Sequence, residues 1–156
     1  MNTTISNPTI KVSVAGVRSV ETARWYGGLF AGSSIPANNT PMVIPLADSG
    51  SVIGAAAFLT VLSDGIAFTD DLTVEANVWA QCSDLGSAPK YLGVRLDSDP
   101  ANQMRMQTSF VNGVATCVVS IVVGVGDTLR FVGLGTTQAF SILAGSISLR
   151  ADSMLS

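Results

Sequence analysis

The chain has 156 residues, of which 47% are hydrophobic and only 12% are charged, and its formal net charge is −3. This length suits one domain with a sizeable core and is short for two. The charged fraction is half of the roughly 25% in an average globular protein, which indicates that other subunits cover part of the surface. The longest apolar run, Cys117–Val123, is far shorter than the roughly 20 residues of a membrane-spanning helix, so we expect no membrane insertion.

Basic residues are scattered along the chain and do not cluster at either end. Proteins that package nucleic acid concentrate positive charge to neutralise phosphates, so we expect no nucleic-acid partner. The first residues also lack the basic and then apolar pattern of a secretory signal. Two cysteines are too few for a disulfide framework, and the composition favours synthesis in the cytoplasm.

The first forty residues differ in pattern from the rest of the chain. They include a possible strand at Thr9–Val14 and a possible short helix at Val17–Trp25, which Gly27 and Gly28 would end. The Ser-, Pro- and Asn-rich link Ser33–Pro41 disfavours continued strand pairing. We therefore expect residues 1–40 to form an N-terminal arm with a linker.

Strand signals recur at short intervals after this link. The predicted strands are Met42–Leu46, Ile53–Leu62, Leu72–Cys82, Tyr91–Leu96, Met104–Val111, Ala115–Val123, Thr128–Gly133 and Phe140–Arg150. Short β-branched runs with Gly, Asp and Pro between them are typical of a sandwich or a barrel. Residues 41–156 are thus expected to form one all-β domain.

Two of these strands have informative side-chain patterns. Leu72–Cys82 alternates between apolar and polar residues, with Trp79 as an exception on the polar face, as a half-buried strand requires. Val118–Val123 is apolar on both faces, which predicts a central strand covered by a subunit interface. We accordingly expect Val118, Ile121 and Val123 to lie at that interface.

Three motifs follow one another in a recognisable order: Asp64–Phe68 ahead of the long strand, the Gly126-Asp127 turn, and the closing Ala144–Leu149 with its internal glycine. Over roughly Pro41–Arg150, this order resembles the tumour-necrosis-factor-like (complement globular-head) jelly roll. The resemblance implies an antiparallel jelly-roll sandwich that forms homotrimers and acts by binding.

The departures from the family are few aromatic residues and an N-terminal segment unlike a collagen stalk. They favour the relatives found in bacteriophage virions, which serve as capsid decoration proteins or fibre tips. We therefore expect a location in the virion.

Residues that could support catalysis are scarce. The chain has no histidine and only two glutamates, Glu21 and Glu75, so a hydrolytic triad is excluded and a carbohydrate-cleaving acid–base pair is disfavoured. The weak metal candidates are Asp70, Asp71, Asp97 and Asp99, which we interpret mainly as solvated turns that cap backbone donors. We expect no enzymatic activity and no cofactor.

Cys82 and Cys117 would lie on neighbouring strands of such a fold. A cross-strand disulfide is possible, but the geometry is demanding and a reducing compartment disfavours it. Buried free thiols that act as small hydrophobic side chains are the preferred interpretation.

Four apolar residues gather near the end of the arm: Trp25, Tyr26, Leu29 and Phe30. They could form an extra strand folded over the domain, or an anchor that docks on a capsid protein or another partner. We weigh the two about equally.

The leading hypothesis is a homotrimeric capsid decoration protein on the exterior of a bacteriophage head, held by residues 1–40 to the major capsid protein or another virion protein. The alternative is a receptor-binding tip of a tail fibre or spike. For that role only the loop Asp97–Gln103 has a suitable composition.

Overall fold

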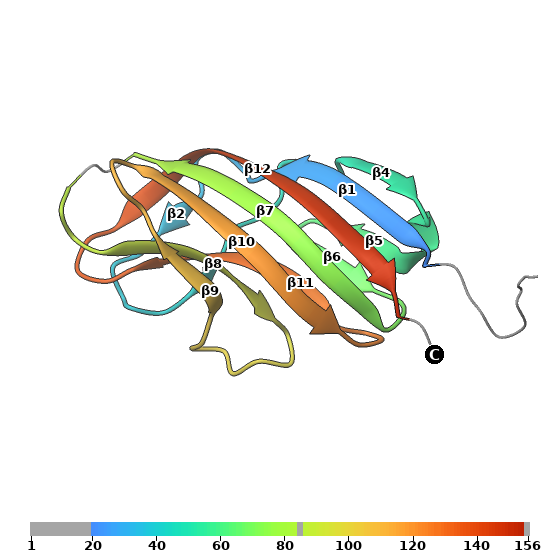
Figure 1. Ribbon diagram of the computed structural model, residues 1–156. Coiled ribbons are helices and arrows are strands. Elements are labelled where there is room, and N and C mark those ends of the chain that lie inside the picture. Colours follow the sequence, from blue (N-terminus) through green and yellow to red (C-terminus); the bar gives the residue numbers. More distant parts are fainter. Residues whose placement is uncertain (1–19, 84–85, 155–156) are drawn as a thin grey trace, which may run out of the picture.

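The computed structural model describes residues 20–83 and 86–154, which form two antiparallel β-sheets packed face to face (Figure 1). The strands are β1 Thr22–Gly28, β2 Ser34–Ile35, β3 Met42–Val43, β4 Ser51–Gly54, β5 Leu59–Leu62, β6 Gly65–Phe68, β7 Leu72–Cys82, β8 Lys90–Leu96, β9 Arg105–Ser109, β10 Val114–Val123, β11 Thr128–Gly135 and β12 Phe140–Ser153. A single 3-10 turn, η1, spans Ala56–Phe58. The expected all-β, tumour-necrosis-factor-like sandwich is confirmed.

The first sheet has the strand order β10-β7-β12-β1-β4, and β2 pairs with β12 beside it. The second sheet has the order β5-β6-β11-β8-β9, and β3 pairs with β11. In Figure 1 the first sheet lies in front, with its long strands running side by side, and the second sheet lies behind it. Most neighbouring strands are not consecutive in the chain, with β5–β6 and β8–β9 as the exceptions, and this is the crossed connectivity of a jelly roll.

The core fills the space between the inner faces of the two sheets. Strand β7 shows how the sequence builds this core, because its residues alternate strictly between buried and exposed, as predicted. The alternation sends Leu72, Val74 and Val78 inward with no exposed surface. Trp25, Phe68 and Phe131 are the largest side chains that are fully buried.

Strand β1 overturns two expectations about the first forty residues. It lies between β12 and β4, and all seven of its residues pair with β12. A helix reaching Trp25 is therefore wrong from Thr22 onward, because Ala23 and Trp25 both point into the core with period two. A domain boundary at residue 40 is likewise contradicted for residues 22–40, since β1 and β2 belong to the first sheet. The possible strand Thr9–Val14 lies outside the described residues.

The segment predicted as one strand, Ile53–Leu62, is divided between the two sheets. Its start belongs to β4 in the first sheet, η1 follows, and β5 belongs to the second sheet. The break comes at Gly54, whose φ is +87°, in a region that favours glycine. A hairpin then connects β5 to β6, a short strand that the sequence analysis did not count.

The remaining predicted strands are present with shifted ends. Strand β12 is longer than predicted and continues to Ser153. Strand β3 is shorter than predicted and ends at Val43, two residues before Pro45, which has no N–H to donate. Tertiary pairing, more than local propensity, sets these ends.

Candidate assembly interface

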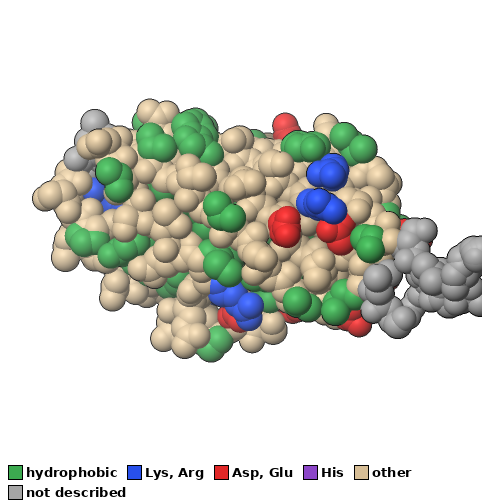
Figure 2. All heavy atoms as spheres, viewed as in Figure 1, with side chains coloured by type: hydrophobic (Ala, Val, Ile, Leu, Met, Phe, Trp, Pro, Cys, Tyr) green, Lys and Arg blue, Asp and Glu red, His purple; other side chains and the backbone are tan. Residues whose placement is uncertain are grey.

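The outer side of the first sheet presents a broad surface, which we call the open face. It consists of the exposed residues of β10, β7, β12 and β1: Val114, Thr116, Val118, Ser120, Val122, Thr73, Glu75, Asn77, Trp79, Gln81, Ser146, Ser148, Arg150, Arg24 and Tyr26. Figure 2 shows this face as mostly backbone, neutral polar groups and hydrophobic side chains, with one cluster of blue and red towards one end. Hydroxyl and valine side chains dominate it, and covering such a surface costs less desolvation energy than covering one of the same size that carries many charged side chains.

Strand β10 does not occupy the central position expected for an apolar strand. It is the edge strand of its sheet, and its residues alternate between exposed and buried. Val118 is 65% exposed and lies on the open face, as does Val122. Ile121 and Val123 point instead into the core of their own chain, so they are not available to a partner. Of the three residues expected at an interface, only Val118 lies on the surface.

The four apolar residues at the end of the expected arm divide in the same way. Trp25 and Leu29 are buried in the core, and the Trp25 Nε1 donates a hydrogen bond of 2.8 Å to the carbonyl oxygen of Ser49. Tyr26 and Phe30 are 43% and 51% exposed. Trp25 and Tyr26 thus belong to a strand of the fold, and Leu29 is buried just after that strand. Only the exposed Tyr26 and Phe30 remain candidates for a partner contact.

Two of the candidate metal ligands, Asp97 and Asp99, are bound by arginines. The Arg130 guanidinium donates to both oxygens of Asp97, at 2.7 and 3.0 Å, and its Nη1 lies 2.6 Å from Asp64 Oδ1. Arg105 makes a similar two-point contact with Asp99, at 2.9 and 2.7 Å. The hydrogen bonds from Arg130 and Arg105 hold the pKa values of Asp97 and Asp99 below their ordinary value. These carboxylates brace the loop after β8.

We expect acid to weaken this brace and lower the free energy of unfolding. A carboxylate with a depressed pKa in the folded state stabilises the protein above its unfolded pKa, near 3.9, and this contribution is lost as the pH falls through the folded value. The expected loss therefore begins near pH 4 and grows below it. Urea unfolding at a series of pH values from 6 to 2.5 measures it.

The variant in which Asp97 and Asp99 are both replaced by asparagine is the matched comparison. Its stability should be lower than that of the original chain at pH 6, and it should fall less steeply in acid. Equal pH dependence in the two proteins would show that the arginine contacts do not stabilise the fold.

The other two metal candidates, Asp70 and Asp71, lie in the turn between β6 and β7. An oxygen of Asp70 accepts the backbone N–H of Asp71 at 2.8 Å, and an oxygen of Asp71 accepts that of Val125 at 3.4 Å. These contacts agree with the interpretation as turn caps. Within residues 20–83 and 86–154, no three His, Cys, Asp or Glu side chains gather into a group that could hold a metal ion.

Cys82 and Cys117 lie on adjacent strands, β7 and β10, but they do not face each other. Cys117 is opposite Val78, four residues before Cys82. Neither cysteine is in a disulfide bond and both are buried, which agrees with the preferred interpretation. Burial raises the pKa of Cys117, and its Sγ donates to the carbonyl oxygen of Met106 at 3.0 Å. The Cys117 thiol is thus kept protonated and unreactive.

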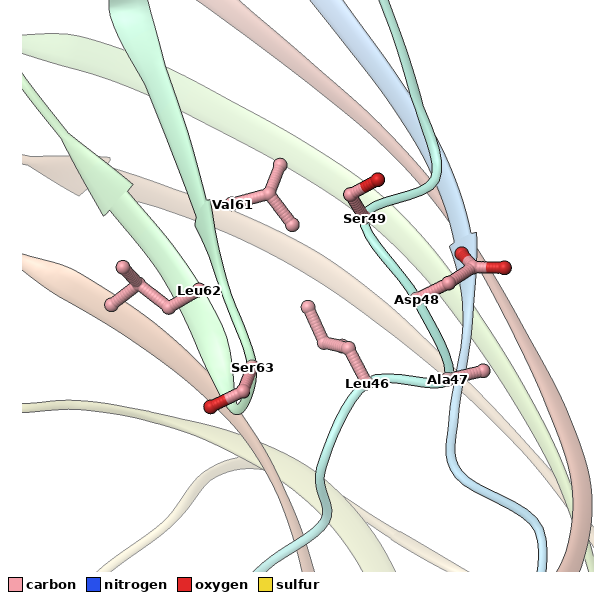
Figure 3. Close-up of a pocket in the computed structure, with 7 residues that line it drawn as sticks. All are labelled: Leu46, Ala47, Asp48, Ser49, Val61, Leu62 and Ser63. Carbon is pink, nitrogen blue, oxygen red and sulfur yellow. The ribbon is translucent and has the colours of Figure 1, made fainter.

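A pocket of about 310 Å³ lies between the segment Leu46–Ser49 and the end of the β5 hairpin at Val61–Ser63 (Figure 3). Leu46 points toward Val61 inside it, whereas Asp48 and Leu62 point away on opposite sides. Asp48, its only ionisable residue, accepts the backbone N–H of Gly50 at 2.8 Å. A single carboxylate that caps a turn provides no acid–base pair for catalysis.

The part of the chain that the structure describes has no helix long and apolar enough to cross a membrane. Neither a protein-family model nor a curated protein matches the sequence. The fold itself does match solved structures, and it defines the class to which this architecture belongs: the tumour-necrosis-factor-like jelly roll.

Three solved structures illustrate the likeness. Murine APRIL superposes with a TM-score of 0.56 at 8% identity, over 87% of this chain and 100% of APRIL. The PRD1 vertex protein P5 gives 0.55 at 14% identity, over 86% of this chain and 96% of P5. The tumour necrosis factor Eiger of S. frugiperda gives 0.50 at 10% identity, over 88% of this chain and 94% of Eiger. Identities this low show a shared fold, and the chain spans nearly the whole of each neighbour.

Proposed function

We propose that this protein is a non-enzymatic structural protein of a bacteriophage particle, which forms a homotrimer and decorates the exterior of the head. The observation that carries the proposal is the open face. It is the outer surface of the sheet formed by the longest strands, and the charged residues exposed on it are Glu75, Arg24 and Arg150. A monomer would normally cover such a surface with charged side chains.

Contact between copies would bury the apolar residues that now lie on this face. Val118 and Val122 are 65% and 60% exposed, and Trp79 and Tyr26 add partly exposed rings. Full burial of a valine stabilises by roughly 1.5–3 kcal/mol, and aromatic rings bury larger areas. Proteins with this fold typically form trimers, so the open face is assigned to the threefold contact.

The viral role is supported by the fold, which is shared with the vertex protein of the phage PRD1, a structural protein of a virus. The non-enzymatic role is supported separately, because the neighbouring tumour-necrosis-factor-like proteins are non-enzymatic and Asp97 and Asp99 are engaged by arginines. We assign attachment to the capsid to the residues that precede β1, together with the exposed ring of Phe30.

Sedimentation of the purified chain tests the trimer. At micromolar concentration we expect a species of three times the chain mass of 16.1 kDa, stable to dilution. A soluble monomer at that concentration would contradict the proposal.

Binding to particles tests the decoration role. Heads stripped of the protein should take up the full chain, and a chain beginning at residue 20 should still trimerise but bind more weakly. If the trimer binds host cells and does not bind heads, the protein is the receptor-binding tip of a fibre or spike.

A further inference from the structure

The charged residues of the open face are aligned in one row across the first sheet. Glu75 of β7 is directly opposite Arg150 of β12, and Arg150 is in turn directly opposite Arg24 of β1. The row therefore reads acidic, basic, basic over three adjacent strands. Figure 2 shows a group of red and blue side chains towards one end of this face and a second group at its lower edge.

Among residues 20–83 and 86–154, only the middle residue of this row has an ion-pair partner in its own chain. The Nε of Arg150 lies 3.0 Å from Asp152 Oδ2, one pair further along the same strand. Among the ion pairs that the described residues form, Arg24 and Glu75 take no part. Neighbouring strands lie about 4.8 Å apart, so the two residues stand about 10 Å from each other, on either side of Arg150.

The position of Arg24 is unfavourable in a single chain. Like charges directly opposite on neighbouring strands are destabilising, and Arg24 has Arg150 opposite it and forms no ion pair with a carboxylate of the described residues. A carboxylate supplied from outside the chain would relieve this repulsion. The face itself carries one unpaired carboxylate, Glu75, at the far end of the row.

We propose that Arg24 of one subunit forms an ion pair with Glu75 of the next, an inference that rests on the homotrimer proposed above. In a cyclic trimer, each contact joins one part of a subunit to a different part of the next subunit. Arg24 of one subunit can therefore meet Glu75 of the next, and the symmetry repeats this pair three times. Both charges are then neutralised, and this register is favoured over those that leave either charge without a partner or bring like charges together.

Charge reversal at each position provides the test. Arg24→Glu alone and Glu75→Arg alone should each raise the dissociation constant of the trimer by about tenfold or more, the size expected when a close interfacial charge pair becomes a repulsion. The double variant restores opposite charges in exchanged positions. We expect its dissociation constant to return to within about threefold of the original.

Arg95→Glu is the matched control. Arg95 lies half-buried on β8 in the second sheet and takes part in none of the ion pairs of the described residues, although its charge helps to lower the pKa values of Asp97 and Asp99. This reversal changes the net charge by the same amount away from the open face. It should leave assembly unchanged. Circular dichroism checks that each variant folds. If a reversal variant does not fold, Arg24→Gln and Glu75→Gln replace it in the test, because they remove the charge without adding repulsion.

The outcomes distinguish failure of the Arg24–Glu75 ion pair from failure of the homotrimer. If the original chain sediments as a monomer, the trimer fails and the ion pair fails with it. If the original chain is trimeric but the single reversals assemble normally, or the double variant assembles no better than they do, only the ion pair is wrong. Equal weakening by Arg95→Glu would likewise overturn it, because the effect would then be one of net charge.

Discussion

Replacing Trp25 with alanine should lower the free energy of unfolding by about 3–5 kcal/mol, as expected when a large aromatic side chain is removed from a core. Trp25 is fully buried, and its indole N–H satisfies the carbonyl oxygen of Ser49. Gly27 and Gly50 approach the ring so closely that a Cβ on either would collide with it. These two neighbours therefore have no side chain that could fill the cavity left by the alanine. A small domain has only 5–15 kcal/mol in total, so the loss should be visible in a urea titration.

Trp79→Ala is the matched control, because it removes the same side chain from a position that is 37% exposed. We expect it to cost less than about half as much unfolding free energy as Trp25→Ala, and to act mainly on assembly. Equal losses at Trp25 and Trp79 would show that Trp25 is not the central residue of the core.

Deleting residues 1–30 should prevent folding. The deletion removes β1, which lies between β12 and β4, and with it Ala23, Trp25 and Leu29 from the core. It also leaves β12 with an unpaired edge beside β2, and exposed edges of this kind promote aggregation. Circular dichroism and solubility after expression measure the effect.

A chain that begins at residue 20 is the control for this deletion. All strands of the fold described above begin after that point, so it should keep a cooperative unfolding transition. If the chain without residues 1–30 also folds cooperatively, β1 is dispensable. The first thirty residues would then be an arm, as the sequence alone suggested.

Strand β7 and the turns after it could be predicted because their signals are local. The alternation in Leu72–Cys82 has period two over eleven residues, and it fixes both the strand and its buried face. The turn at Gly126-Asp127 also follows from its residues, since Gly126 has a φ of +85° and Asp127 accepts the backbone N–H of Gly124. Local chemistry is enough where the pattern is long or the turn needs glycine.

The candidate interface was less predictable, because the exposure of a side chain depends on which strands lie beside its own strand and on what covers each face of the sheet. Valines at both faces of β10 looked like a central strand, yet β10 lies at the edge and only alternate valines are buried. The sequence also contained Asp97 and Arg130 without a sign that they would meet, since 33 positions separate them. The signal that could have identified the open face is the alternation of polar with apolar residues along β7 and along Ser146–Arg150 of β12.

By itself, the sequence determined the class of the fold, the alternating strands, the turns and the low surface charge, because each of these follows from residue type and short-range periodicity. Only the tertiary structure decided that β1 belongs to the first sheet and which valines face outward. It also decided that Arg24 and Glu75 share one row. These features depend on which distant strands pair, and backbone pairing between strands carries almost no record in the local sequence.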